Sequence, residues 1–182
     1  MNRVLVIYAS THGHTAKIAA RIAKAIGPAA ELHDIASATG LEPWHYDAVV
    51  VGASVHAGHH QKAVIDWARG YAGALNGMPS AFFSVCLSAA DDTDEARATA
   101  RRYVDDFVEE TGWTPRRTAS FAGALQYLEY DFFTRLLIRM RMHRGGHPTD
   151  STQDYDYTDW DAVWRFGGEI AGMILPAAAP VP

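Results

Sequence analysis

The chain has 182 residues, enough for one well-buried core, and its length favours a single domain spanning residues 1–182. Apolar residues make up 48% and charged residues 20% of the chain, which argues against long disordered stretches, and a net charge of -5 argues against a general nucleic-acid binder. The single cysteine, Cys86, excludes an intramolecular disulfide and agrees with a reducing compartment, so we expect a cytoplasmic protein.

Neither a signal peptide nor a membrane span is expected. The apolar run at residues 4–8 is too short for a signal peptide and lacks a small-residue cleavage site after it. No stretch approaches the roughly 18 uninterrupted apolar residues that a spanning helix needs. Any membrane contact is therefore expected to be peripheral.

Strand and helix signals alternate along most of the chain, which predicts a parallel sheet with helices on both faces. A continuous apolar run at residues 3–8 is typical of a strand buried on both sides, and helical spacing of apolar residues follows at 15–26. We expect further strands at about 30–35, 49–51, 80–85 and 119–122, and further helices at about 61–71, from 92–95 onward and from 158 onward.

Both later helices carry start signals. The first has acids and cap residues at 92–95, and its buried face is expected to hold Ala100, Tyr103, Val104, Phe107 and Val108. The second has Thr158 with Asp161 three residues on, as in a capping box, and its apolar face is expected to hold Trp160, Val163, Trp164 and Ile170. Residues 124–157 do not fit the alternation and are interpreted as an insertion with a specialised function, and the tail after Leu175 is expected to fray.

The turn between the first strand and its helix predicts a phosphate site. Helix N-terminal N–H groups lack internal partners and favour an anion, hydroxyl side chains add donors, and a glycine lets the backbone curl closely around it. The turn has neither the Gly-Lys-Ser/Thr of a nucleotide P-loop nor a Gly-x-Gly-x-x-Gly fingerprint. A capping turn without a ligand is the alternative. The residues expected to contact the phosphate are Ser10, Thr11, His12, Gly13, His14 and Thr15.

Two more loops are expected at the same end of the sheet, after the third and fourth strands, where ligands of doubly wound sheets bind. Small residues dominate both loops, residues 52–60 and 84–90, and let main-chain groups approach a flat ring. The residues expected to contact a ring-shaped cofactor here are Ala53, Ser54, Val55, His56 and Gly58 in the first loop and Val85, Cys86, Leu87 and Ser88 in the second.

The turn resembles the flavodoxin phosphate loop, Ser/Thr-x-Thr-Gly-x-Thr, with His12 in place of the middle threonine. The wider chain resembles the quinone-dependent protoporphyrinogen oxidases of the flavodoxin-like group. That resemblance covers nearly the whole chain and is carried by residues 52–60, 78–85, 122–127 and 157–160.

The resemblance implies a flavodoxin-like, doubly wound five-stranded parallel sheet of order 2-1-3-4-5, with an insertion near strand 5. It also implies FMN as cofactor, and oxidation of protoporphyrinogen IX with electrons passed to menaquinone or ubiquinone in haem synthesis. The protein would then be peripheral on the inner face of the cell membrane, and a homo-oligomer stays open.

The insertion contains a basic, apolar segment, residues 132–144, in an otherwise acidic chain. Drawn as a helix, it has an apolar stripe flanked by arginines, a pattern typical of helices at a membrane surface. Its arginines also match porphyrin carboxylates in geometry. A helix packed on the core with solvated arginines is the alternative. The expected contact residues are Phe132, Phe133, Arg135, Arg139 and Arg141.

The histidines of the 52–60 loop admit several roles. A metal site is disfavoured because that loop has no Asp, Glu or Cys to complete a ligand set. His56 or His59 is a candidate proton donor beside the flavin, and a solvated histidine is the alternative. No set of residues that demands covalent catalysis is evident, so the chemistry is expected to be flavin-centred.

Three other functions are compatible with the same fold. A flavodoxin-type electron carrier is the main alternative, an NAD(P)H:quinone reductase is a second, and a scaffold without FMN is a third. The basic segment at 132–144 separates the first of these from an oxidase, since an ordinary flavodoxin is not expected to carry it.

Overall fold

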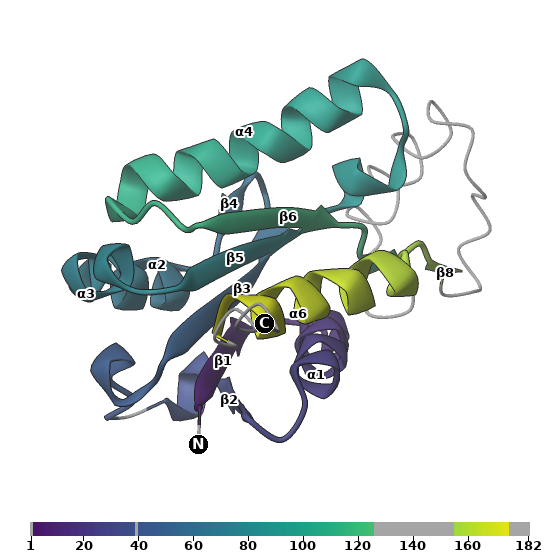
Figure 1. Cartoon of the computed structure of the whole chain (residues 1–182). Helices are drawn as coiled ribbons and strands as arrows, with labels where there is room; N and C mark the ends of the chain where they lie inside the picture. The colour runs from purple at the N-terminus through teal and green to yellow at the C-terminus, as the bar shows by residue number, and fades with distance from the viewer. Residues whose placement is uncertain (1, 39, 126–154, 175–182) are drawn as a thin grey trace, which may run out of the picture.

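The computed structural model of the protein describes residues 2–38, 40–125 and 155–174, and these form a parallel sheet between two helical layers (Figure 1). The sheet order β2-β1-β3-β5-β6 is that of a doubly wound flavodoxin-like fold, as predicted. All neighbouring pairs along this order are parallel. The strands are β1 Val4–Ala9, β2 Ala30–Asp34, β3 Ala48–His56, β5 Ser80–Val85 and β6 Arg117–Phe121.

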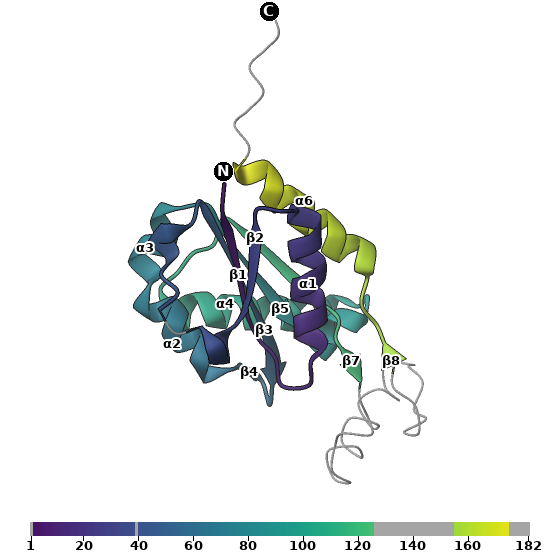
Figure 2. The same ribbon diagram turned by 90° about the horizontal axis from the view of Figure 1, so that it is seen from below.

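Helices cover both faces of the sheet (Figure 2). One face packs against α1 His14–Ile26 and α6 Trp160–Ile174, which also contact each other. The opposite face packs against α2 Lys62–Gly70, α3 Ala72–Gly77 and α4 Asp94–Thr111. Short 3-10 turns complete the described chain: η1 Ile35–Ser37, η2 Pro43–His45 and η3 Leu87–Ala90.

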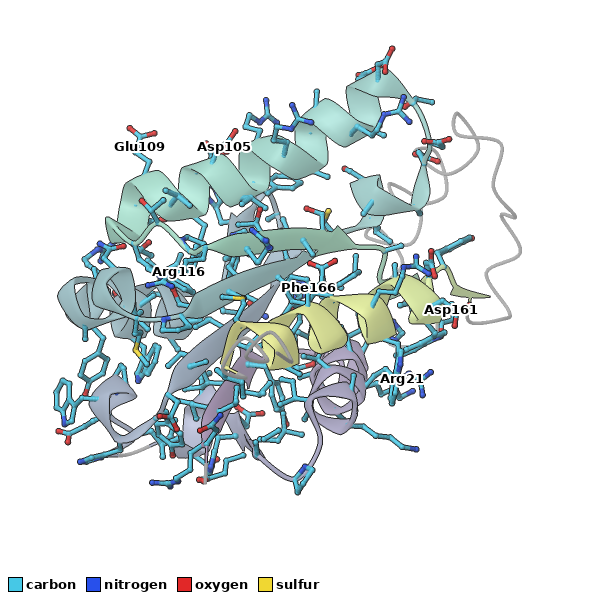
Figure 3. All side chains as sticks on the ribbon, viewed as in Figure 1. Arg21, Asp105, Glu109, Arg116, Asp161 and Phe166 are labelled. Atoms are coloured by element: carbon cyan, nitrogen blue, oxygen red, sulfur yellow. The ribbon has the colours of Figure 1, made fainter. Side chains whose placement is uncertain are left out.

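The alternation of the buried strands produces two hydrophobic cores. Val4, Val6 and Val50 point toward α1 and α6, whereas Leu5 and Ile7 point toward α2 and α4, because successive strand side chains face opposite sides. Phe166 of α6 is directed at the sheet, while Asp105 and Glu109 of α4 lie on its exposed outer side (Figure 3).

A hairpin corrects the predicted loop after the third strand. Strand β3 continues to His56, and β4 His59–His60 pairs with it antiparallel. Ala57 and Gly58 form the two-residue connection with positive φ angles of 49° and 88°, the backbone that tight hairpins require. Residues 52–60, predicted as a loop, are therefore held largely in strand pairing.

Helix boundaries also differ in places from the predictions. The expected helix at 61–71 ends at Gly70, and α3 follows it. The cap predicted at Thr158 is wrong: Asp159 Oδ1 accepts hydrogen bonds from the backbone N–H groups of Asp161 and Ala162, and the Thr158 hydroxyl is engaged elsewhere. Trp164, expected on the buried face, is 40% exposed and lies under the Arg21 guanidinium.

The segment interpreted as an insertion begins and ends in a two-stranded antiparallel sheet, β7 Ala124–Leu125 with β8 Tyr155–Asp156. Residues 126–154 between these strands lie outside the described residues, as does the tail after Ile174. Within the described ranges, no helix has the length and apolar character needed to cross a membrane.

Candidate functional site

Three loops leave the sheet from the same edge. Ala9 at the end of β1 pairs with Ala53, and Ser54 pairs with Val85 at the end of β5. The turn after β1, the β3–β4 hairpin and the η3 segment after β5 therefore begin side by side. This is the carboxyl end of the parallel sheet, where doubly wound folds bind their ligands.

The turn after β1 has the features of an anion site. Gly13 is the N-cap of α1 with a φ of 77°, and no side chain caps the helix, so the first N–H groups have no capping partner. Ser10 Oγ is buried and has no hydrogen-bond partner in the described protein. A buried hydroxyl without a partner is costly, and a bound phosphate oxygen at this helix end would supply one.

Gln61 joins the first two loops and was not among the predicted site residues. Its amide Nε2 donates to Ser54 Oγ at 2.6 Å and to Thr11 Oγ1 at 3.3 Å, while its Oε1 is buried with no partner in the described protein. The sequence placed Gln61 only at a helix start, and it is indeed the N-cap residue of α2. Its role depends on contact with residues far away in the chain.

His56 and His12 meet across the same two loops. Their ring centroids lie 5.6 Å apart at an edge-to-face angle, and His56 Nε2 is 3.1 Å from Ser54 Oγ. Burial lowers the pKa of His56, and the neighbouring His12 lowers it further. The structure therefore holds His56 as a neutral, half-buried imidazole at neutral pH.

The remaining histidines of the hairpin have different surroundings. His59 is exposed, whereas His60 is buried against Phe82 and Phe107 and hydrogen-bonded to Ser84 Oγ at 2.9 Å. Burial lowers the pKa of His60 to about 4, with a smaller contribution from His59. His60 is a neutral core residue. In the described ranges, no three His, Cys, Asp or Glu side chains gather closely enough to hold a metal ion.

His14 faces away from the hairpin, toward the start of α6. Its Nε2 lies 2.7 Å from Thr158 Oγ1, and its ring contacts Trp160 edge-on at 5.8 Å. Burial lowers the pKa of His14, although Asp156, 3.6 Å away, opposes the effect. The His14 side chain therefore makes its contacts within the protein, and its backbone N–H belongs to the uncapped first turn of α1.

The loop after β5 closes the third side. Cys86 and Ser88 are buried, and the Cys86 N–H donates to Phe121 O at the end of β6. Leu87 begins the η3 turn and is partly exposed. The loop thus begins at the same sheet edge as the other two loops, and contact of its residues with a ring-shaped cofactor stays a prediction.

Comparisons with known proteins agree on the family to which the chain is similar. A family model described as a flavodoxin domain matches residues 5–152. A protoporphyrinogen IX dehydrogenase [quinone] of Leishmania major is 38% identical over 98% of this chain and 78% of that protein. The protein of the same name from Escherichia coli K12 is 35% identical over 94% of this chain and 96% of its own length.

The chain belongs to the flavodoxin-like protoporphyrinogen IX dehydrogenase family.

Solved structures agree with the fold of this family. Flavodoxin 1 from Bacillus cereus superposes with a TM-score of 0.55 at 18% identity, covering 94% of this chain and 98% of that one. A short-chain flavodoxin associated with a non-canonical PDU bacterial microcompartment gives 0.60 at 14% identity, covering 96% and 100%. At such low identity these likenesses establish the fold alone.

The described part of this family member thus places three groups of predicted residues at one edge of the sheet. Hydrogen bonds and ring contacts join the β1 turn to the β3–β4 hairpin, and strand pairing places the β5 loop beside them. A further set of predicted contact residues lies outside the described residues: Phe132, Phe133, Arg135, Arg139 and Arg141.

Proposed function

We propose that this protein is an FMN-dependent dehydrogenase that oxidises protoporphyrinogen IX to protoporphyrin IX and passes the electrons to a membrane quinone. The observation that carries the proposal is 35% to 38% identity, across nearly the whole chain, to proteins that bear this activity in their names. The whole chain, residues 1–182, is proposed to act as one flavodoxin-like domain.

The residues at the sheet edge fit FMN. Ser10 Oγ is a buried hydroxyl that lacks a partner in the described protein, and it adjoins the uncapped start of α1, where a phosphate is favoured. Thr11, Gly13 and Thr15 would complete the phosphate contacts. The loops proposed to flank the flavin ring consist of residues 53–58 and 85–88.

Bound FMN would supply the two-electron redox chemistry of the reaction. The protein's contribution is to hold and orient it and to control access to its edges. Gln61 fixes the spacing between the β1 turn and the hairpin, because one amide group bonds to a side chain of each. His56, neutral and half-buried beside Ser54, is proposed as a proton donor or acceptor at the ring.

The segment between β7 and β8 is proposed to reach the substrate and the membrane. Arg135, Arg139 and Arg141 would pair with porphyrin carboxylates or lipid phosphates, and Phe132 and Phe133 would enter the apolar layer. The protein would then work in the cytoplasm, held peripherally on the inner face of the membrane. Binding to anionic liposomes that is lost when all three arginines are changed to glutamine would support this part.

The decisive experiment is an anaerobic assay of the FMN-loaded protein with protoporphyrinogen IX and a soluble quinone. We expect porphyrin fluorescence to rise only when protein and quinone are both present. Without a quinone-dependent rise, the protein would be an electron carrier of the same fold, and rapid flavin reduction by NADPH would identify a reductase.

The role of His56 is tested in the same assay. His56→Ala is expected to lower turnover by about a hundredfold, the low end of the contribution from a positioned acid or base. His59→Ala is the matched comparison, since His59 is exposed on the next strand. Unchanged turnover in both variants would eliminate His56 and His59 as proton donors or acceptors.

A further inference from the structure

A hydrogen-bonded chain of three residues connects the β1 turn to the start of α6. Thr158 Oγ1 donates to the backbone oxygen of Ala122 at 2.9 Å, and His14 Nε2 lies 2.7 Å from the same hydroxyl. His14 and Ala122 are buried, and Thr158 is partly buried. Water therefore competes poorly with these bonds.

The direction of the chain follows from the hydroxyl chemistry. A threonine hydroxyl has one hydrogen, and Thr158 donates it to Ala122 O. With that hydrogen directed at Ala122 O, both contacts are paired when His14 Nε2 donates to Thr158 Oγ1, as the Nε2–H tautomer of the neutral ring does. The chain thus runs from His14 through Thr158 to Ala122, and reversing either bond would leave one contact without a proton.

Asp156 holds the Thr158 backbone in place. The backbone N–H of Thr158 donates to Asp156 Oδ1 at 2.9 Å, and Trp160 Nε1 donates to Asp156 Oδ2 at 3.1 Å. Asp156 belongs to β8, and Trp160 is the first residue of α6. The position of the Thr158 hydroxyl is therefore determined by the junction of these two elements.

The residues at the two ends of this chain lie at functionally distinct places. His14 is the first residue of α1, next to Gly13, so its backbone N–H is one of the uncapped groups at the proposed phosphate site. Ala122 lies between β6 and β7, beside Phe121, whose oxygen accepts from Cys86 of the β5 loop. The chain thus links the phosphate turn, the β5 loop and both strands from which residues 126–154 depart.

We propose that Thr158 is a positioning residue that holds the β1 turn in its phosphate-binding conformation through His14. It thereby couples phosphate binding to the stability of the two-stranded β7–β8 sheet, called here the β7–β8 base. This rests on the proposed FMN site. The hydrogen bonds of Thr158 hold His14, whose backbone N–H lies at the proposed phosphate site. Loss of the Thr158 hydroxyl is therefore expected to weaken binding of the phosphate and to leave contacts with the flavin ring unchanged. By linkage, phosphate binding at the turn stabilises the β7–β8 base in return.

The first test compares FMN with riboflavin, which has the same ring without the phosphate. Thr158→Val removes the hydroxyl at nearly constant volume and is expected to raise the Kd for FMN about tenfold, the loss of roughly one hydrogen bond. The Kd for riboflavin is expected to change by less than about twofold. Thr158→Ser is expected to restore FMN affinity, and Thr118→Val, at an exposed threonine of β6, is the control.

The second test uses the unaltered protein and measures backbone amide exchange over residues 155–162. FMN is expected to slow amide exchange in this stretch, whereas riboflavin at equal saturation is expected to leave it unchanged. In Thr158→Val, the FMN effect is expected to disappear from this stretch while protection of the β1 turn persists.

Equal weakening of FMN and riboflavin by Thr158→Val, or equal protection of residues 155–162 by both ligands, would overturn the inference. Either result would show a general packing role. These outcomes differ from failure of the proposed FMN site, in which the unaltered protein would bind neither flavin, and from failure of the proposed reaction, in which both flavins would bind as expected here while the quinone assay stays negative.

Discussion

Single buried polar atoms distinguish this site from an ordinary capping turn. Ser10 Oγ and Gln61 Oε1 are both buried without partners in the described protein, and both lie at the carboxyl edge of the sheet. A buried polar atom without a partner needs an explanation, and a ligand or water bound at this edge would supply one. Each such atom lowers the stability of the ligand-free protein, and this effect can be measured.

Ser10→Ala is therefore expected to separate stability from binding. The ligand-free variant should be as stable as the parent or slightly more stable, because a buried unpaired hydroxyl is removed. Its FMN affinity should fall by about tenfold, since one hydrogen bond to a charged phosphate is lost. Urea unfolding without ligand and FMN fluorescence quenching measure the two effects, and a large loss of ligand-free stability would contradict this assignment.

His60 makes the stability of the fold depend on pH. Its pKa is about 4 in the folded protein because of burial, compared with 6.5 for an ordinary histidine. A depressed folded pKa means that the stabilisation is present above pH 6.5 and is lost as the pH falls from 6.5 toward 4. The loss across this window is expected to be about 3 kcal/mol.

His60→Gln is expected to remove this part of the pH dependence, because glutamine can hydrogen-bond to Ser84 without titrating. The free energy of unfolding, measured in urea at pH 7 and pH 4.5, should differ less in the variant than in the parent. His59→Gln, at the exposed neighbour, should keep the parental difference. The same pH slope in all three proteins would show that His60 is not the group responsible.

At the scale of elements, contact between α1 and α6 depends on a glycine. A Cβ at Gly167 would lie 2.6 Å from Ala25 Cβ and 2.8 Å from Ile22 O, whereas a Cβ at Gly168 would meet nothing within 4 Å. Gly167→Ala is expected to destabilise the protein by about 1–3 kcal/mol through overpacking. Gly168→Ala is expected to stabilise it by up to about 1 kcal/mol through helix propensity. Thermal unfolding of the two variants tests the contrast, and an equal shift would refute the close contact.

Elements with a strong local signal could be predicted from the sequence. The apolar run of β1 and the periodic pattern of α1 were located to within a residue or two, and Thr93 caps α4 as its type suggests. The β3–β4 hairpin was missed because its turn uses Ala57, a residue that rarely adopts positive φ. The Thr158 cap was wrong because a tertiary hydrogen bond competes for the same hydroxyl.

In the candidate site too, residues with a local sequence signal could be predicted, and residues that depend on long-range contacts could not. The phosphate turn lies within six consecutive residues, so its hydroxyls, glycine and helix start could be read together, and their binding role stays a prediction. The sequence placed Gln61 and Thr158 only at helix starts, and their tertiary roles were missed because their partners Thr11 and His14 are 50 and 144 residues away. A residue whose role depends on such distant contacts has no local signal in a single sequence.

At the scale of the whole molecule, the two cores share the same strands. Val50 and Val51 are adjacent on β3, yet one packs toward α1 and α6 and the other toward α2 and α4. Loss of either helical layer would expose the central strands on one side. The layers are therefore expected to unfold together.

We thus expect a single two-state unfolding transition, with FMN raising its midpoint. Near-UV circular dichroism, to which aromatic residues of both cores contribute, and far-UV circular dichroism from all helices should give superimposable urea curves. Free FMN at about a hundred times its Kd should add about 2.7 kcal/mol to the free energy of unfolding, because only the folded sheet edge assembles all three loops. Riboflavin should add less, since it cannot use the phosphate turn. Two separated transitions, or stabilisation by FMN confined to one of them, would mean that the helical layers fold independently and that residues 1–182 are not one domain.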